Sequence, residues 1–273
     1  MLMSYENCVL CPSCKKGFLA LCSSGNREVQ CSDCFTSYLL KDDVLDLLPD
    51  APARRSLAQV AMESNLIVSI YESRLWRRSP LLSALMGTSF QREYELIVQA
   101  AELDGAQRVL DLACGSGIYT RPFAHRLPGG SVIGLDLSLP MLSYATRQAR
   151  AERLENLIFI RANALDLPFP TGLFDVVNCC GALHLFPALN RALNEVSRVL
   201  KPGGRFTVAA FRRREGRASE YVARLRHQLL GINAFTLDEL SSCFLEAGLE
   251  AGQVHHVWGI WLIISTRKPL ETS

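Results

Sequence analysis

The stretch that decides the fold is Arg108-Val109-Leu110-Asp111-Leu112-Ala113-Cys114-Gly115-Ser116-Gly117. The apolar residues at its start are typical of a buried parallel strand. Gly115 and Gly117 carry no Cβ, so the backbone there can turn sharply and pass close to another group. Helical spacing of apolar residues follows over 118–127. Strand, glycine turn and helix together predict a nucleotide-binding corner, with the ligand beyond the carboxyl end of the strand.

The residues around this turn indicate which nucleotide it binds. A dinucleotide fingerprint has a third glycine where this chain has Thr120. Asp111, just before the turn, would repel a pyrophosphate but suits a ligand with an ammonium group. The apolar run 132–135 ends in Asp136, which is well placed to accept hydrogen bonds from ribose hydroxyls. The whole pattern points to S-adenosylmethionine.

Composition sets outer limits on the function. The chain has 273 residues, of which 49% are hydrophobic, enough for one α/β domain and a small accessory module. A formal charge of +2 does not by itself favour nucleic acid as a partner. We find no apolar stretch of membrane-spanning length and no signal-peptide pattern at the start. The expectation is a soluble cytoplasmic protein.

Cysteines are concentrated near the start of the chain. Cys11 and Cys14, then Cys31 and Cys34, form two Cys-x-x-Cys pairs with zinc-ribbon spacing. Four thiolates complete a closed tetrahedral site, so the expected Zn²⁺ is structural. Cys8 and Cys22 could substitute, but the paired arrangement needs neither. The remaining cysteines read as small buried hydrophobes: Cys114, Cys179, Cys180 and Cys243.

The order of predicted elements divides the chain into three parts. Residues 1–50 form the ribbon, 51–104 a linker and helical cap, and 105–273 the cofactor-binding core, which alternates strand and helix. That alternation predicts an α/β fold, a parallel sheet with helices on both faces. Further strands are expected at 157–161, 174–177, 205–211, 254–257 and 261–266. Within the second part, 70–78 is either a cap over the pocket or an amphipathic helix with a solvated basic face.

Several motifs of the core resemble the class I S-adenosylmethionine-dependent methyltransferases, most closely the type that methylates quinone precursors and other small metabolites. They are Val109–Gly117, Gly134-Leu135-Asp136, Leu167-Pro168-Phe169, Phe174–Val177 and Arg198–Gly204. The resemblance implies a Rossmann-like sheet of seven strands with the last strand antiparallel. It also implies a cofactor site lined by Tyr71, Asp111, Ala113, Gly115, Gly117, Asp136, Leu137, Met141, Asn163, Ala164 and Cys180.

Individual roles follow from the same resemblance. Asp111 and the Gly115–Gly117 turn would hold the methionine end, Asp136 the ribose, and Asn163 with Ala164 the adenine. Many relatives have aspartate where this chain has Asn163. An amide oxygen can still accept a hydrogen bond from the adenine amino group.

Three functions are compatible with these features. The first is a methyltransferase acting on oxygen, carbon or nitrogen of a small molecule. The second is an rRNA or tRNA base methyltransferase, with the ribbon and an arginine cluster binding phosphates. That cluster comprises Arg212, Arg213, Arg214, Arg217, Arg224 and Arg226. The third is a protein that holds the cofactor without transferring methyl. The oligomeric state is left open.

One histidine is a candidate general base. His184 follows the fourth core strand, where the pocket should open. It would be needed only if the acceptor must lose a proton, and it could equally shape the pocket or bond the backbone, since many methyltransferases rely on proximity alone.

Overall fold

The computed structural model describes residues 7–22, 28–48 and 79–270. Seven core strands stand side by side in the order β7 (Leu157–Arg161), β6 (Ser131–Asp136), β5 (Arg108–Leu112), β8 (Phe174–Cys180), β9 (Leu200–Phe211), β11 (Trp261–Arg267) and β10 (Gln253–Trp258). Strands β5 to β9 run parallel, whereas β11 is antiparallel to β9. The expected sheet, with its antiparallel last strand, is confirmed. The chain moves from β5 to β6 on one side and to β8 on the other, which creates a crevice at the carboxyl ends of β5 and β8.

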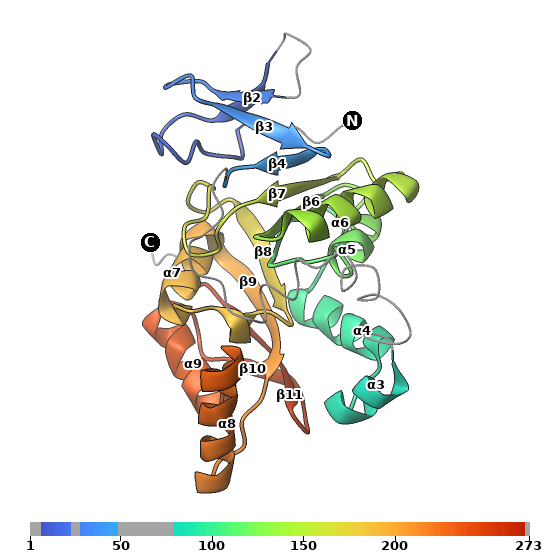
Figure 1. The fold of residues 1–273 in the computed structure, drawn as a ribbon, viewed down its shortest axis with the longest axis vertical. Helices are drawn as coiled ribbons and strands as arrows, with labels where there is room; N and C mark the ends of the chain where they lie inside the picture. Colours follow the sequence, from blue (N-terminus) through green and yellow to red (C-terminus); the bar gives the residue numbers. More distant parts are fainter. Residues whose placement is uncertain (1–6, 23–27, 49–78, 271–273) are drawn as a thin grey trace.

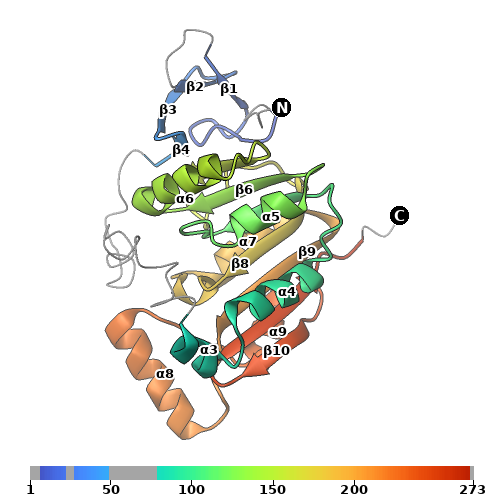
Figure 2. The same cartoon turned by 90° about the vertical axis from the view of Figure 1, so that its right-hand side faces the viewer.

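Helices cover both faces of this sheet (Figures 1 and 2). Helices α4 (Phe90–Ala101), α5 (Thr120–Arg126) and α6 (Leu139–Ala151) lie on one face, and α7 (Leu189–Val199) and α9 (Leu237–Glu246) on the other. Leu110 and Leu112 join one buried cluster, while Val109 joins the cluster on the opposite face. This alternation explains the apolar run, because side chains of a sheet covered on both faces are buried on either side.

Local signals in the sequence account for several helix boundaries. Ser138 caps α6 by accepting from the backbone N–H of Met141, and Thr236 with Glu239 forms a complete capping box on α9. Helix α5 begins at Thr120 rather than at 118, since Gly117, with φ +77°, still belongs to the turn. Strand β9 begins at Leu200, earlier than the predicted 205, because its first residues pair with β8 through a bulge.

The ribbon is joined to the core by its last strand. Strands β1 (Leu19–Leu21), β2 (Glu28–Cys31), β3 (Ser37–Lys41) and β4 (Val44–Asp46) form an antiparallel meander. Strand β4 then pairs in parallel with β7, so the described strands make one sheet of eleven (Figure 1). The order of predicted elements set the ribbon, residues 1–50, apart from the core. The ribbon is a continuation of the core sheet.

Two further helices lie at the opposite end of the molecule from the ribbon. They are α3 (Pro80–Met86) and α8 (Arg217–Leu230), and Figure 2 shows both beyond the last strands of the sheet. The predicted cap segment 70–78, with Tyr71, lies outside the described residues. None of the helices in the described ranges combines the length and apolarity needed to cross a membrane.

Candidate cofactor and methyl-transfer site

Asp136 and the glycine turn meet at the carboxyl ends of β5 and β6. One carboxylate oxygen of Asp136 accepts from the backbone N–H of Gly115 at 2.8 Å, and the other from the N–H of Ser138 at 2.8 Å. The side chain is partly exposed. The carboxylate therefore sits between the turn and the start of α6, fixed in orientation and partly exposed.

The turn itself depends on left-handed backbone conformations. Ala113, Gly115 and Gly117 have φ of 55°, 54° and 77°. A Cβ on Gly115 would project into open space, whereas one on Gly117 would lie 3.1 Å from the Cβ of Ala145. Gly117 is thus required by close packing against α6. Gly115 borders the space in front of Asp136, where a ligand would lie.

Asp111 occupies a different environment from Asp136. It is 2% exposed, and its two oxygens accept from the Thr120 hydroxyl at 2.5 Å and from the Asn178 amide at 2.7 Å. Burial raises the pKa of Asp111 to about 6, while both hydrogen bonds counteract the rise. The role of Asp111 at the methionine end of the cofactor stays a prediction. Because its oxygens are bonded to Thr120 and Asn178, Asp111 would act on a cationic ligand through its negative charge or through these two neighbours.

Asn178 was not singled out from the sequence, yet it connects several strand ends. Besides bonding Asp111, its amide oxygen accepts from the Thr207 hydroxyl at 2.9 Å and from the Cys180 thiol at 3.1 Å. It is fully buried on β8. In the sequence, Asn178 is noticeable only as a polar residue at the end of an apolar strand. A polar side chain buried in such a place is normally hydrogen-bonded to other buried polar groups, as it is here.

The residues expected near the adenine lie on adjoining segments. Met141 is buried in the first turn of α6, and Leu137 directly follows Asp136. The side-chain oxygen of Asn163 accepts from the N–H of Leu165 at 2.9 Å, and Ala164 is 8% exposed. One lone pair of that amide oxygen is therefore used within the loop, and a contact between Asn163 and the adenine amino group stays a prediction.

His184 is less accessible than a typical general base. It lies in a short 3₁₀ turn (Leu183–Leu185), is 4% exposed, and its ring centroid is 4.4 Å from that of Phe211. Burial, and then the charge of Arg226, lower the pKa of His184 to about 3. The imidazole is neutral at physiological pH, and in this environment it is a weak proton acceptor.

The four predicted zinc ligands converge. The Sγ atoms of Cys11, Cys14, Cys31 and Cys34 all lie within 4.8 Å of one another, and the Cys11–Cys34 and Cys14–Cys31 separations are both 3.6 Å. Tetrahedral zinc with thiolate ligands requires sulfur separations of roughly 3.8 Å. Backbone N–H groups also point at Cys14 and Cys31, as expected of metal thiolates. The residues fit a structural zinc ion, and the set includes neither Cys8 nor Cys22.

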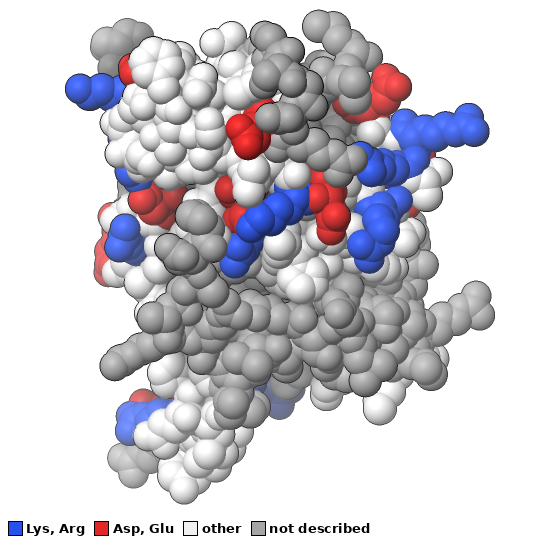
Figure 3. All heavy atoms as spheres, turned by 45° about the horizontal axis from the view of Figure 1, so that its top comes forward, with Lys and Arg blue, Asp and Glu red and all other residues white. Residues whose placement is uncertain are grey.

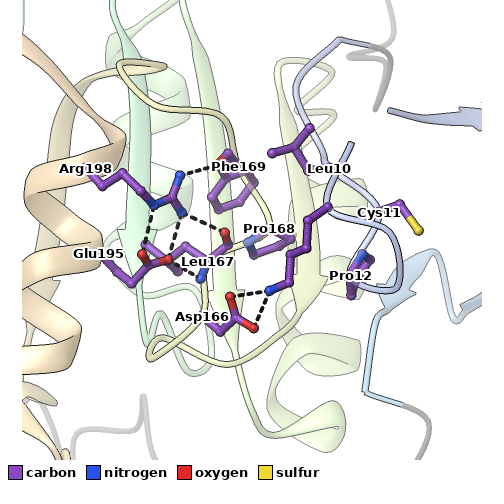
Figure 4. A pocket seen from close by; sticks show the side chains of 10 residues that line it. Leu10, Cys11, Pro12, Asp166, Leu167, Pro168, Phe169, Glu195 and Arg198 are labelled. Atoms are coloured by element: carbon purple, nitrogen blue, oxygen red, sulfur yellow. Dashed lines mark hydrogen bonds and ion pairs between the residues drawn. The ribbon is translucent and has the colours of Figure 1, made fainter. Parts of the chain in front are cut away.

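A pocket of about 230 Å³ marks the seam between this cysteine cluster and the core (Figure 4). Its charged side chains are already engaged with protein partners. Lys15 pairs with Asp166, and Arg198 binds Glu195 together with the carbonyls of Leu167 and Phe169. The charged side chains of this seam therefore pair with one another, and the Lys15–Asp166 pair joins the ribbon to the core.

The arginine cluster is also partly engaged. Arg213 pairs with Glu239 and Arg224 with Glu220, while Arg226 lies over the ring of Phe211. On the face that carries the ribbon, the described basic and acidic side chains are interspersed (Figure 3). These arrangements give little support to a continuous phosphate-binding surface among the described residues.

Comparisons with known proteins agree with this architecture. Residues 109–204 match the family model of a methyltransferase domain. An uncharacterised chloroplastic methyltransferase of Arabidopsis thaliana is 26% identical over 95% of this chain and 77% of its own length. A demethylmenaquinone methyltransferase of Thermus thermophilus is 45% identical over 38% of this chain and 47% of its own. Among solved structures, phosphoethanolamine N-methyltransferase 2 of Haemonchus contortus with S-adenosyl-L-methionine has a TM-score of 0.66 at 16% identity, covering 80% of this chain and 61% of that one.

The chain spans about half the length of several curated relatives that it matches. Residues 109–204 nevertheless carry a methyltransferase domain. The methyltransferase relatives and the strand order of the fold support a class I S-adenosylmethionine-dependent methyltransferase.

Proposed function

We propose that this protein transfers a methyl group from S-adenosylmethionine to a small-molecule acceptor. The observation that carries the proposal is the partly exposed carboxylate of Asp136, held in place by the N–H groups of Gly115 and Ser138 at the glycine turn. A fixed carboxylate there suits the ribose hydroxyls, and Gly115 leaves room beside it. Thr120 in place of a third glycine, bonded to Asp111, favours this cofactor over a dinucleotide.

The cofactor would supply an electrophilic methyl group on a sulfonium. The protein's contribution is then to exclude water and to hold the acceptor in line with the methyl carbon, about 3 Å away. The carboxylate of Asp111, hydrogen-bonded by Thr120 and Asn178, would place a negative charge beside the methionine end of the cofactor. His184 would receive a proton only from an acceptor acidic enough to match a weak base.

A small acceptor is favoured over RNA by the state of the arginines and by the relatives. Arg213 and Arg224 are held by carboxylates. The Thermus thermophilus relative is a demethylmenaquinone methyltransferase, and its similarity to the core supports an aromatic or quinone-like acceptor here.

We also propose that the ribbon holds one structural Zn²⁺ through Cys11, Cys14, Cys31 and Cys34. Four thiolates leave no open coordination position, so the ion would stabilise the fold and take no part in the reaction.

Calorimetric titration of the zinc-loaded chain with S-adenosylhomocysteine tests the cofactor assignment. We expect saturable one-site binding that is lost in Asp136→Ala, with NAD⁺ as the negative control. Labelled cofactor offered separately with a metabolite extract and with cellular RNA then tests the acceptor. Label entering only RNA would contradict the small-molecule proposal, and absence of cofactor binding would contradict the whole assignment.

A further inference from the structure

A group of rings lies beside the proposed cofactor site, at the carboxyl ends of β8 and β9. Phe211 ends β9, and its centroid is 4.4 Å from His184 and 5.5 Å from Trp261. The guanidinium carbon of Arg226, from α8, lies 5.4 Å from the centroid of Phe211. One cationic side chain and one histidine thus border a largely buried aromatic cluster.

Two buried nitrogen atoms of the side chains that border the Phe211 ring have no hydrogen-bond partner within the described part of the chain. They are Nδ1 of His184 and Nε of Arg226, and both atoms are buried. Leaving a buried polar atom unsatisfied costs about 1–3 kcal/mol, so each such atom calls for a partner, such as a ligand, an ordered water or an ion. The two side chains therefore have unused binding capacity at the same place.

The surrounding backbone holds the two side chains in a fixed relation. The N–H of Asn233 donates to the carbonyl of His184 at 2.8 Å, and Nη2 of Arg226 lies 3.5 Å from the carbonyl of Asn233. The loop after α8 thereby ties the helix to the turn that follows β8. A Cβ on Gly181 would lie 3.8 Å from the ring of Trp261, so the group adjoins the strand end that carries Asn178 and Cys180.

We propose that Arg226 and His184 form a subsite for an anionic oxygen on a flat, apolar methyl acceptor. The rings of Phe211 and Trp261 would contact the flat body of that molecule, while Arg226 and the neutral imidazole donate to its carboxylate or phenolate oxygen. This inference rests on the proposed function, because it places the acceptor next to the cofactor. It adds a requirement that the fold does not impose, namely a negative charge on the acceptor.

Binding of small aromatic probes to the full, zinc-loaded chain tests the proposal. 2-Naphthoate and 2-naphthamide have the same ring system, but only the first carries an anionic oxygen. We measure each by competition or calorimetry, with and without S-adenosylhomocysteine, and use 4-nitrophenolate at alkaline pH as the phenolate counterpart. We expect 2-naphthoate to bind about tenfold more tightly than 2-naphthamide, a preference worth about 1.4 kcal/mol.

Three variants at two arginines of the same helix make the test specific. Arg226→Gln should abolish the preference for 2-naphthoate, and Arg226→Lys should keep part of it. Arg224→Gln removes an exposed arginine paired with Glu220 and should leave the preference unchanged. Circular dichroism and the cofactor titration verify that each variant is folded.

The outcomes separate this proposal from the proposed function. Equal binding of both naphthalenes, no saturable binding of 2-naphthoate or 4-nitrophenolate, or an undiminished preference in Arg226→Gln would each overturn the anionic subsite. Failure of S-adenosylhomocysteine to bind would overturn the proposed function, while the comparison of the two naphthalenes would still decide whether the subsite exists. Tighter binding of 4-nitrophenolate than of 2-naphthoate would assign the site to phenolates.

Discussion

The junction between ribbon and core gives a sharp prediction, because it contains a buried ion pair. Nη1 of Arg161 lies 3.1 Å and 3.2 Å from the two carboxylate oxygens of Asp46 and donates to the carbonyl of Leu48 at 2.7 Å. The side chains of Arg161 and Asp46 are only 10% and 2% exposed. Nε of Arg161 also donates to the carbonyl of Leu137, next to Asp136. One arginine thus connects the ribbon to the cofactor loop.

Asp46→Ala would leave Arg161 buried without its counter-ion. Removing one partner of a buried pair typically lowers the free energy of unfolding by about 3–5 kcal/mol. This is a large share of the 5–15 kcal/mol that is usual for a whole domain. The second substitution Arg161→Met removes the stranded charge, so the double variant should regain part of the loss. Asp166→Ala is the matched control, since its pair with Lys15 spans the same seam at 51% and 57% exposure. It should cost less than about 1 kcal/mol.

Urea unfolding of the zinc-loaded chain, followed by circular dichroism and tryptophan fluorescence, measures these differences. The cofactor affinity of each variant is measured in parallel, because loss of the Arg161 contact to Leu137 should also weaken binding. If Asp46→Ala costs no more than Asp166→Ala, the reasoning is refuted. Separate unfolding of the ribbon before the core in the unsubstituted protein would equally refute a shared sheet as the source of stability.

Three further predictions concern the cofactor site and the metal. Burial raises the pKa of Asp111 to about 6, above the unfolded value of about 3.9. Ionisation of Asp111 therefore lowers the free energy of unfolding as pH rises from about 3.9 to about 6, and the full loss is reached above about pH 6. Asp111→Asn should raise the free energy of unfolding at pH 8 by on the order of 2 kcal/mol while weakening S-adenosylhomocysteine binding; a less stable variant would contradict this. Gly117→Ala should destabilise the chain by about 1–2 kcal/mol in thermal unfolding, because φ is +77° and the added Cβ meets Ala145. A Cβ on Gly115 would meet no neighbouring atom, so Gly115→Ala should lower the free energy of unfolding less than Gly117→Ala does, but it should weaken cofactor binding more. Equal effects of the two variants on stability and on cofactor affinity would contradict this prediction. Chelation should release one zinc ion per chain, measured by atomic absorption, and lower the unfolding temperature, whereas Cys14→Ser should not retain the metal and Cys22→Ser should.

The sequence by itself determined the parts of the molecule that depend on neighbours along the chain. The strand, glycine turn and helix at Arg108–Arg126 follow from local apolar spacing and from glycines with positive φ. Helix starts at Ser138 and Thr236 follow from capping residues, and the four-cysteine cluster follows from the spacing of two knuckles. In each of these the interacting groups lie near one another in sequence or carry a characteristic repeat, so their pattern is readable without coordinates.

Only the tertiary structure decided how distant groups meet. Asp46 and Arg161 are separated by 115 residues, and nothing in either segment indicates that β4 extends the core sheet. The low pKa of His184 arises from burial and from the charge of Arg226, which comes from α8, more than 40 residues later in the chain. Burial and charge at a site are sums over every element packed around it, and that packing is fixed when the sheet assembles.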